Sequence, residues 1–147
     1  MTSIELIREA IAVAQASLLS NDVPVGALVI DPSGKIIASG TNEREAKSDP
    51  TAHAEIVAMR KAATNGWRLD NHTLVVTLEP CAMCAGAIAQ ARISKVIFGA
   101  WDEKAGAAGS VWDVLRDPRA IHRVEVESGV LGKECAALLS EFFRSGQ

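Results

Sequence analysis

Two short segments of the chain carry side chains that could bind a metal ion. Residues 53–55 read His-Ala-Glu, and residues 80–84 read Pro-Cys-Ala-Met-Cys. Together they offer one imidazole and two thiolates, the number of protein ligands that a catalytic zinc keeps when a fourth position stays open for water. The pattern predicts a catalytic zinc site in which His53, Cys81 and Cys84 hold one Zn²⁺.

Glu55 is predicted to move protons and not to bind the metal. Two thiolates cancel the charge of Zn²⁺, so such a centre should acidify water less strongly than an all-histidine site. A carboxylate outside the ligand set can then take a proton from water and deliver it to the substrate. Residues two apart on a helix point in different directions, so His53 and Glu55 can serve one site only if the pocket lies over the first turn of their helix.

The competing reading of these ligands is a closed, structural zinc site with a fourth protein ligand. The remaining histidines and cysteine are His72, His122 and Cys135. Cys135 falls on the apolar face of the last predicted helix, which favours a place in the core. His72 follows Asp70 in a turn-like segment, which favours a solvated or capping role. We therefore expect an open, catalytic site.

Length and composition set broad limits. The 147 residues are the size of one domain, 48% of them are hydrophobic, and 22% are charged, so we expect a single globular domain over residues 1–147. No apolar run approaches the ~18 residues that span a bilayer, and no secretory signal is visible at the N-terminus. We therefore expect a cytoplasmic protein with no membrane partner. The net charge of −3 means that any RNA binding must use a local basic patch.

Apolar patterning predicts an α/β protein, with one mixed sheet flanked by helices. Strands are expected over residues 23–30, 35–39, 73–78, 95–99 and 123–127. Helices are expected over residues 2–19, 49–63, 80–92 and 111–116, with a last helix whose apolar face carries Leu131, Cys135, Leu138 and Phe142. In the first helix, Thr2 and Glu5 have capping-box spacing, and the expected buried stripe is Ile4, Ile7, Ile11, Ala14 and Leu18. Both ligand segments fall at helix N-termini, which lower the pKa of a thiol.

Nearly end to end, the chain resembles the bacterial tRNA-specific adenosine deaminases, which belong to the cytidine/deoxycytidylate deaminase-like superfamily and convert the wobble adenosine to inosine. The matching segments include residues 22–27, 49–55 and 77–87. The more diagnostic ones follow the zinc motifs, at residues 96–100, 104–110 and 135–144. Zinc binding does not need these later segments, so they separate this family from its small-molecule relatives.

The resemblance implies a three-layer cytidine-deaminase-like fold, one zinc ion per subunit and a homodimer. It implies that the partner is a tRNA anticodon loop, that of an arginine tRNA in particular. Glu55 would shuttle protons and Asn42 would hydrogen-bond the flipped adenine. Asp102 and Lys104 match a loop that contacts the nucleotides flanking the target.

Two alternatives stay open at this point. One is a zinc deaminase of a free nucleobase or nucleoside, of the guanine or cytosine type. The other is a non-enzymatic zinc module that binds RNA or a partner and has no need of Glu55. Trp101 departs from the polar residue found in many relatives, and could stack on a base or pack at a subunit contact. The basic residues that could form an RNA patch are Arg60, Lys61, Arg68, Lys104 and Arg144.

Overall fold

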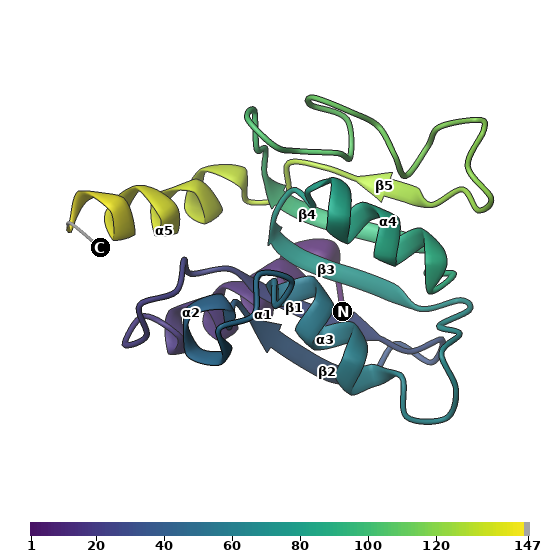
Figure 1. Ribbon diagram of the computed structural model, residues 1–147, viewed down its shortest axis with the longest axis horizontal. Coiled ribbons are helices and arrows are strands. Elements are labelled where there is room, and N and C mark those ends of the chain that lie inside the picture. Colours follow the sequence, from purple (N-terminus) through teal and green to yellow (C-terminus); the bar gives the residue numbers. More distant parts are fainter. Residues whose placement is uncertain (146–147) are drawn as a thin grey trace.

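A five-stranded mixed sheet forms the centre of the protein, and the computed structural model describes residues 1–145 (Figure 1). The strands are β1 (Gly26–Ile30), β2 (Ile36–Thr41), β3 (Thr73–Leu78), β4 (Lys95–Ala100) and β5 (Glu125–Glu127). Their order in the sheet is β2-β1-β3-β4-β5. β1 is antiparallel to both β2 and β3, whereas β3, β4 and β5 run parallel. The predicted α/β fold, with one mixed sheet flanked by helices, is confirmed, and α4 forms the crossover between the parallel strands β3 and β4.

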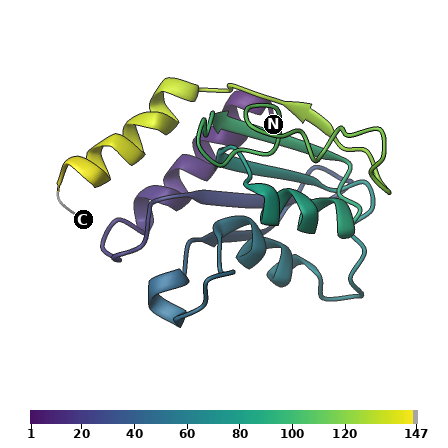
Figure 2. The same cartoon turned by 45° about the horizontal axis from the view of Figure 1, so that its top comes forward.

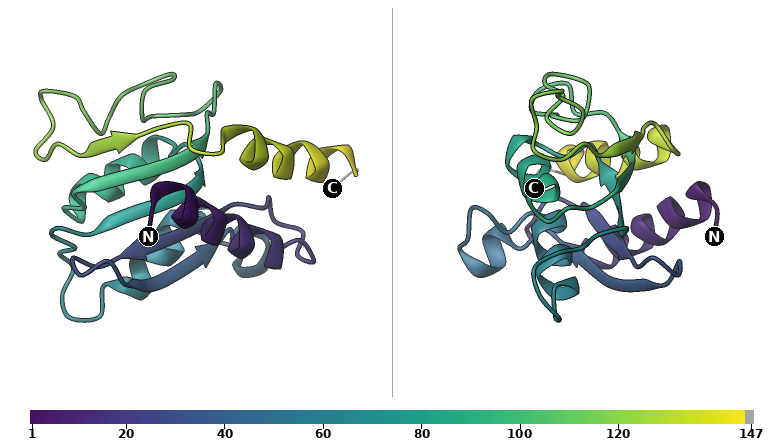
Figure 3. Two further views of the ribbon diagram at one scale, coloured as in Figure 1. Left: turned by 180° about the vertical axis from the view of Figure 1, so that it is seen from behind. Right: turned by 90° about the vertical axis from the view of Figure 1, so that its right-hand side faces the viewer.

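Helices cover both faces of this sheet and make three layers. They are α1 (Ser3–Ala16), α2 (Arg44–Lys47), α3 (Ala54–Ala62), α4 (Ala82–Gln90) and α5 (Gly132–Arg144). α3 and α4 lie on one face, in front of the sheet in Figure 1. α1 lies on the opposite face, as the tilted view and the view from behind show (Figures 2 and 3). α5 packs on that face too, against β4, β3 and α1.

Alternation along β3 explains the two apolar cores. Leu74 and Val76 face α3 and α4, while Val75 between them faces α1 and α5. Successive side chains of a strand point to opposite faces, so a continuous apolar strand is buried on both sides. Because packing on both faces holds the central strands in place, the turn that follows β3 and leads to Cys81 is also held in place.

The helices α1 and α3 are shorter than predicted. α1 begins after Thr2, whose side chain accepts from the Glu5 backbone in the predicted capping box. It ends at Ala16, and the predicted burial of Ile4 and Leu18 is wrong, because they are 50% and 46% exposed. α3 begins at Ala54 and not near residue 49, because the Asp49 carboxylate accepts from the backbone and hydroxyl of Thr51 and holds that stretch in a turn.

The segments around residues 44 and 113 also differ from prediction. The helix expected over residues 111–116 is absent from the part of the chain that the structure describes; turns replace it, and Arg116 pairs with Asp113 within them. The loop expected before residue 49 contains α2. Buried Asp22 stabilises this short helix by accepting from the backbone N–H groups of Glu45 and Ala46.

Among residues 1–145, every helix is too short or too polar to cross a membrane.

Candidate metal centre and active site

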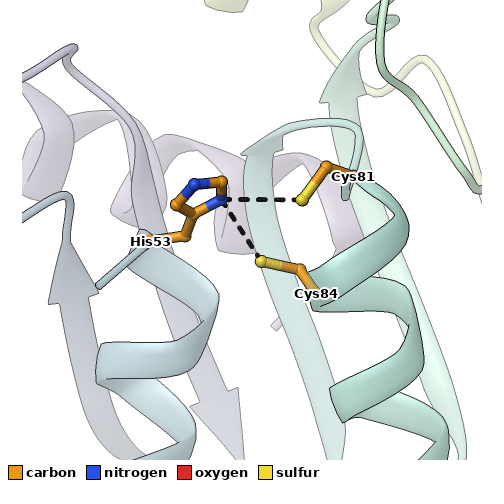
Figure 4. Close-up of side chains that lie close together, drawn as sticks. All are labelled: His53, Cys81 and Cys84. Atoms are coloured by element: carbon orange, nitrogen blue, oxygen red, sulfur yellow. Dashed lines mark hydrogen bonds between the residues drawn. The ribbon is translucent and has the colours of Figure 1, made fainter. Parts of the chain in front are cut away.

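The three predicted ligands meet where α3 and α4 begin (Figure 4). His53 is the N-cap of α3 and Cys81 is the N-cap of α4, and both have extended backbones. Cys84 lies in the first turn of α4, on a buried face. His53 precedes the helix and Glu55 lies in its first turn, so the two side chains need not diverge as residues two apart within a helix do. The condition that the pocket lie over the first helical turn is therefore met.

The distances between the donor atoms fit one zinc ion. His53 Nδ1 lies 3.6 Å from Cys81 Sγ and 3.5 Å from Cys84 Sγ. All three donor atoms lie within 4.8 Å of one another. Tetrahedral coordination with ordinary Zn–N and Zn–S bonds separates nitrogen from sulfur by about 3.6 Å. The residues therefore fit Zn²⁺ without rearrangement.

The two thiol groups of the cluster have very different pKa values. The hydrogen bond from Cys84 lowers the pKa of Cys81 to about 3, and His53 acts in the same direction. The same hydrogen bond raises the pKa of Cys84, as does its burial. The Cys81 thiolate also raises the pKa of His53. A metal that binds both sulfurs must displace the proton of Cys84, so zinc binding releases protons.

Glu55 is a buried carboxyl group beside this cluster, with 5% of its surface exposed. Burial raises its pKa to about 7, and the negative charge of Cys81 adds to the effect. A group that titrates near neutral pH can both accept and donate a proton under physiological conditions. Glu55 therefore has the properties of a general acid–base.

The remaining histidines and cysteine lie away from the cluster. His72 Nδ1 lies 2.8 Å from the Asp70 carbonyl, and His122 Nε2 lies 2.8 Å from the Ile93 carbonyl. Cys135 is buried on α5, on the other face of the sheet. Within residues 1–145, the metal-binding group therefore contains three side chains only. This leaves an open coordination position and argues against a closed structural site.

A pocket of about 160 Å³ opens over the cluster. It is lined by Val23, Val25, Asn42, Arg44, His53, Glu55, Leu78, Glu79, Cys81, Asp102 and Ala105. Asn42 and Asp102, predicted from the resemblance, thus join the ligands and Glu55. Lys104 is exposed and lies beside the pocket, where its backbone N–H donates to Asp102 Oδ1.

Several residues of this lining are not among those predicted from the sequence. Val23 and Val25 lie just before strand β1 in a segment that matches the family, but their residue type points to no role in a pocket. Arg44 lies in α2, a helix that the sequence pattern does not predict. Glu79 carries the clearest overlooked signal, because a charged residue that directly follows an apolar strand and precedes Pro80 is unusual in a core.

The five basic residues expected near the pocket do not line it within residues 1–145. Arg60 pairs with Asp49, Arg68 pairs with Asp70, and Arg144 pairs with Glu141. Arg44 is the cation in the lining. Trp101 is 46% exposed and packs edge-on against Phe98.

A mixed sheet that delivers His, Cys and Cys to one open metal position, with a buried carboxyl beside it, defines the zinc-dependent deaminase class. A family profile described as the cytidine and deoxycytidylate deaminase zinc-binding region matches residues 1–100. The chain belongs to the cytidine and deoxycytidylate deaminase family and is a zinc-dependent hydrolase.

Three similar proteins refine this assignment. The tRNA-specific adenosine deaminase of Haemophilus influenzae is 47% identical over 142 residues, covering 95% of this chain and 82% of that protein. A structure from studies of A-to-I editing by tRNA:A34 deaminases at the wobble position is 38% identical, with a TM-score of 0.87 over 92% of this chain and 99% of that one. Guanine deaminase from Nitrosomonas europaea is 25% identical, with a TM-score of 0.76 over 92% and 81%. The fold is thus shared by deaminases of different substrates, and sequence identity favours the tRNA-specific group.

Proposed function

We propose that this chain catalyses the hydrolytic deamination of adenosine to inosine at the wobble position of a tRNA anticodon, with an arginine tRNA as a substrate. The observation that carries the proposal is one pocket containing His53, Cys81, Glu55 and Asn42. The relative that is 47% identical, named a tRNA-specific adenosine deaminase, supports the choice of substrate.

The chemistry replaces the exocyclic amine of adenine by oxygen, consuming water and releasing ammonia. His53, Cys81 and Cys84 would hold Zn²⁺, which when bound supplies Lewis-acid activation of water. The Glu55 carboxylate accepts a proton from the water and returns it to the ring nitrogen beside the reacting carbon. It then takes the remaining proton from the newly added hydroxyl group and transfers it to the amine, whose bond to the carbon breaks to release ammonia. Its burial and raised pKa suit this exchange.

Substrate recognition in this scheme begins with Asn42. Its Nδ2 donates to the Val23 carbonyl at 2.9 Å, which fixes the orientation of the amide. Oδ1 and one N–H then remain for the edge of an unstacked base, which a single-stranded loop can present. Asp102 and Lys104 contact flanking nucleotides, and Arg44 provides a cation for a nearby phosphate. These local contacts would allow RNA binding by a chain of net charge −3.

The same proposal includes the setting in which the enzyme works. The chain acts as a single deaminase domain over residues 1–147, of which 146 and 147 lie outside the described residues. It forms a homodimer and works in the cytoplasm, where tRNA is available. A reducing compartment would keep Cys81 and Cys84 free for the metal.

The direct test offers zinc-loaded protein four substrates: a wobble-adenosine stem-loop of an arginine tRNA, the same stem-loop with wobble guanosine, free guanine and free cytosine. We expect inosine in the first stem-loop, detected by sequencing as guanosine, and no turnover of the others. Turnover of a free base with the stem-loop adenosine intact would support the free-nucleobase deaminase instead. Zinc binding with no turnover of any substrate would support the non-enzymatic module.

A further inference from the structure

Glu79 is a buried carboxylate that makes no ion pair among residues 1–145. It is 1% exposed and follows the last residue of β3. Burying a carboxylate is unfavourable unless hydrogen bonds replace those that it made to water. The side chain therefore requires donors.

Three backbone N–H groups supply these hydrogen bonds, and all come from one loop. The Asp102 N–H donates to Glu79 Oε1 at 3.0 Å. The N–H groups of Ala108 and Ser110 donate to Oε2 at 2.9 and 3.1 Å. Bonds from N–H to a carboxylate are about twice as strong as those between neutral groups. One side chain thus holds both the beginning and the end of residues 102–110.

The loop closes tightly around this carboxylate. Ser110 Oγ donates to the Asp102 carbonyl at 2.9 Å, joining the two ends of the loop. At Gly106, any Cβ would overlap Glu79 Oε1 and Ser110 Oγ, so only glycine lets the loop backbone lie this close to the carboxylate. The conformation of the loop therefore depends on the position of the Glu79 carboxylate.

This loop forms one wall of the pocket. Asp102 and Ala105 line it, and Asp102 Oδ1 accepts from the backbone N–H groups of Lys104 and Ala105 at 3.1 Å. The loop is also joined to the turn that carries Cys81, because Ala107 N–H donates to the Pro80 carbonyl at 2.8 Å. A displacement of the loop would move the substrate-facing wall, while His53 and Glu55 stand on a different element.

We propose that Glu79 is a positioning residue that fixes the 102–110 loop as the substrate-recognition wall of the pocket. The inference rests on the proposed function, because it assigns this wall to the nucleotides around the target adenosine. Glu79 itself acts through the loop and takes no part in the proton transfers.

The test compares Glu79→Gln with the matched control Glu9→Gln, which makes the same change of charge at an exposed site on α1, outside the pocket and the loop. The Gln amide keeps the size of the side chain but turns one acceptor into a donor that faces N–H groups. In Glu79→Gln we expect about 10-fold faster exchange of the Asp102, Ala108 and Ser110 amides. We also expect an about 10-fold higher KM for the stem-loop, with kcat within about 3-fold of wild type and one zinc per chain. Glu9→Gln should match wild type.

The KM-against-kcat split separates positioning from general destabilisation. Unchanged amide exchange and KM in Glu79→Gln would overturn the inference. A loss of zinc, or a lower kcat at constant KM, would overturn it as well. Glu79 would then act by holding the turn that carries Cys81, and not by holding the loop. If Glu79→Gln fails to fold, Gly106→Ala provides a second test, because its Cβ would push the loop away from Glu79. This variant should also raise KM while kcat stays near the wild-type value. A wild-type KM in Gly106→Ala would contradict the inference. A wild-type protein that leaves the stem-loop intact would refute the proposed function, and the exchange measurement would still decide whether Glu79 holds the loop.

Discussion

At the scale of single residues, the metal site depends on where two helices begin. His53 and Cys81 are N-caps, and Cys84 follows within the first turn of α4. The exposed backbone N–H groups and dipole of a helix N-terminus stabilise negative charge, which favours thiolates. The short N···S distances in Figure 4 follow from this convergence of two N-termini.

The first prediction concerns the ligand set. Replacing Cys84 by Ser removes a soft thiolate ligand, so we expect zinc content to fall from one per chain to less than about one-tenth after dialysis. The matched control is Cys135→Ser, which changes the same residue type at a buried position on the other face of the sheet. Elemental analysis measures both. Full zinc content in Cys84→Ser would show that the cluster is not the metal site.

These ligands could be predicted from sequence because their chemistry is local. A thiol–thiol spacing of three after a proline and a strand restricts the geometry to one turn. The role of Glu79 could not be predicted in the same way, since its three donors are 23 to 31 residues away. Such contacts depend on the path of a loop, which apolar periodicity does not encode.

At the scale of elements, periodicity predicted the strands and longer helices, and local side-chain bonds decided where they end. Asp49 holds a turn before α3, and Asp22 caps α2 from a distant part of the chain. The prediction of a helix over residues 111–116 is wrong, because this segment forms turns in which Val114 N–H donates to the Ala107 carbonyl. Short helices depend on such tertiary bonds more than on propensity.

The packing of α5 on β4 gives a prediction about pH. Burial raises the pKa of Cys135 to about 11, from an ordinary value of 9.0. Between these values the unfolded chain loses the thiol proton while the folded chain keeps it, so the free energy of unfolding falls as pH rises from about 9 to about 11. The expected loss is at most about 3 kcal/mol. It should be smaller in Cys135→Ala, as urea unfolding at each pH would show. Equal pH slopes in the two proteins would contradict this account of α5.

At the scale of the whole molecule, the sheet places the pocket at the carboxyl end of β3 and β4. Parallel α/β sheets commonly bind ligands there, where loops and helix N-termini meet. The beginnings of α3 and α4, which lie side by side in Figure 1, supply the imidazole, Glu55 and the thiolates, and the loop after β4 supplies Asp102. The fold alone does not choose the substrate, since a guanine deaminase shares it. The choice rests on the lining of the pocket and on identity with the tRNA-specific relatives.

In the proposed reaction, a metal centre and a separate proton-transfer group act together on a wobble adenosine. Glu55→Gln tests this most directly, because it keeps the size of the buried side chain and removes its ability to accept the proton. We predict one zinc per chain, stem-loop affinity within about 3-fold of wild type, and a deamination rate lowered by about 10²–10⁴-fold. Deamination at the wild-type rate by a zinc-loaded Glu55→Gln protein would contradict the account.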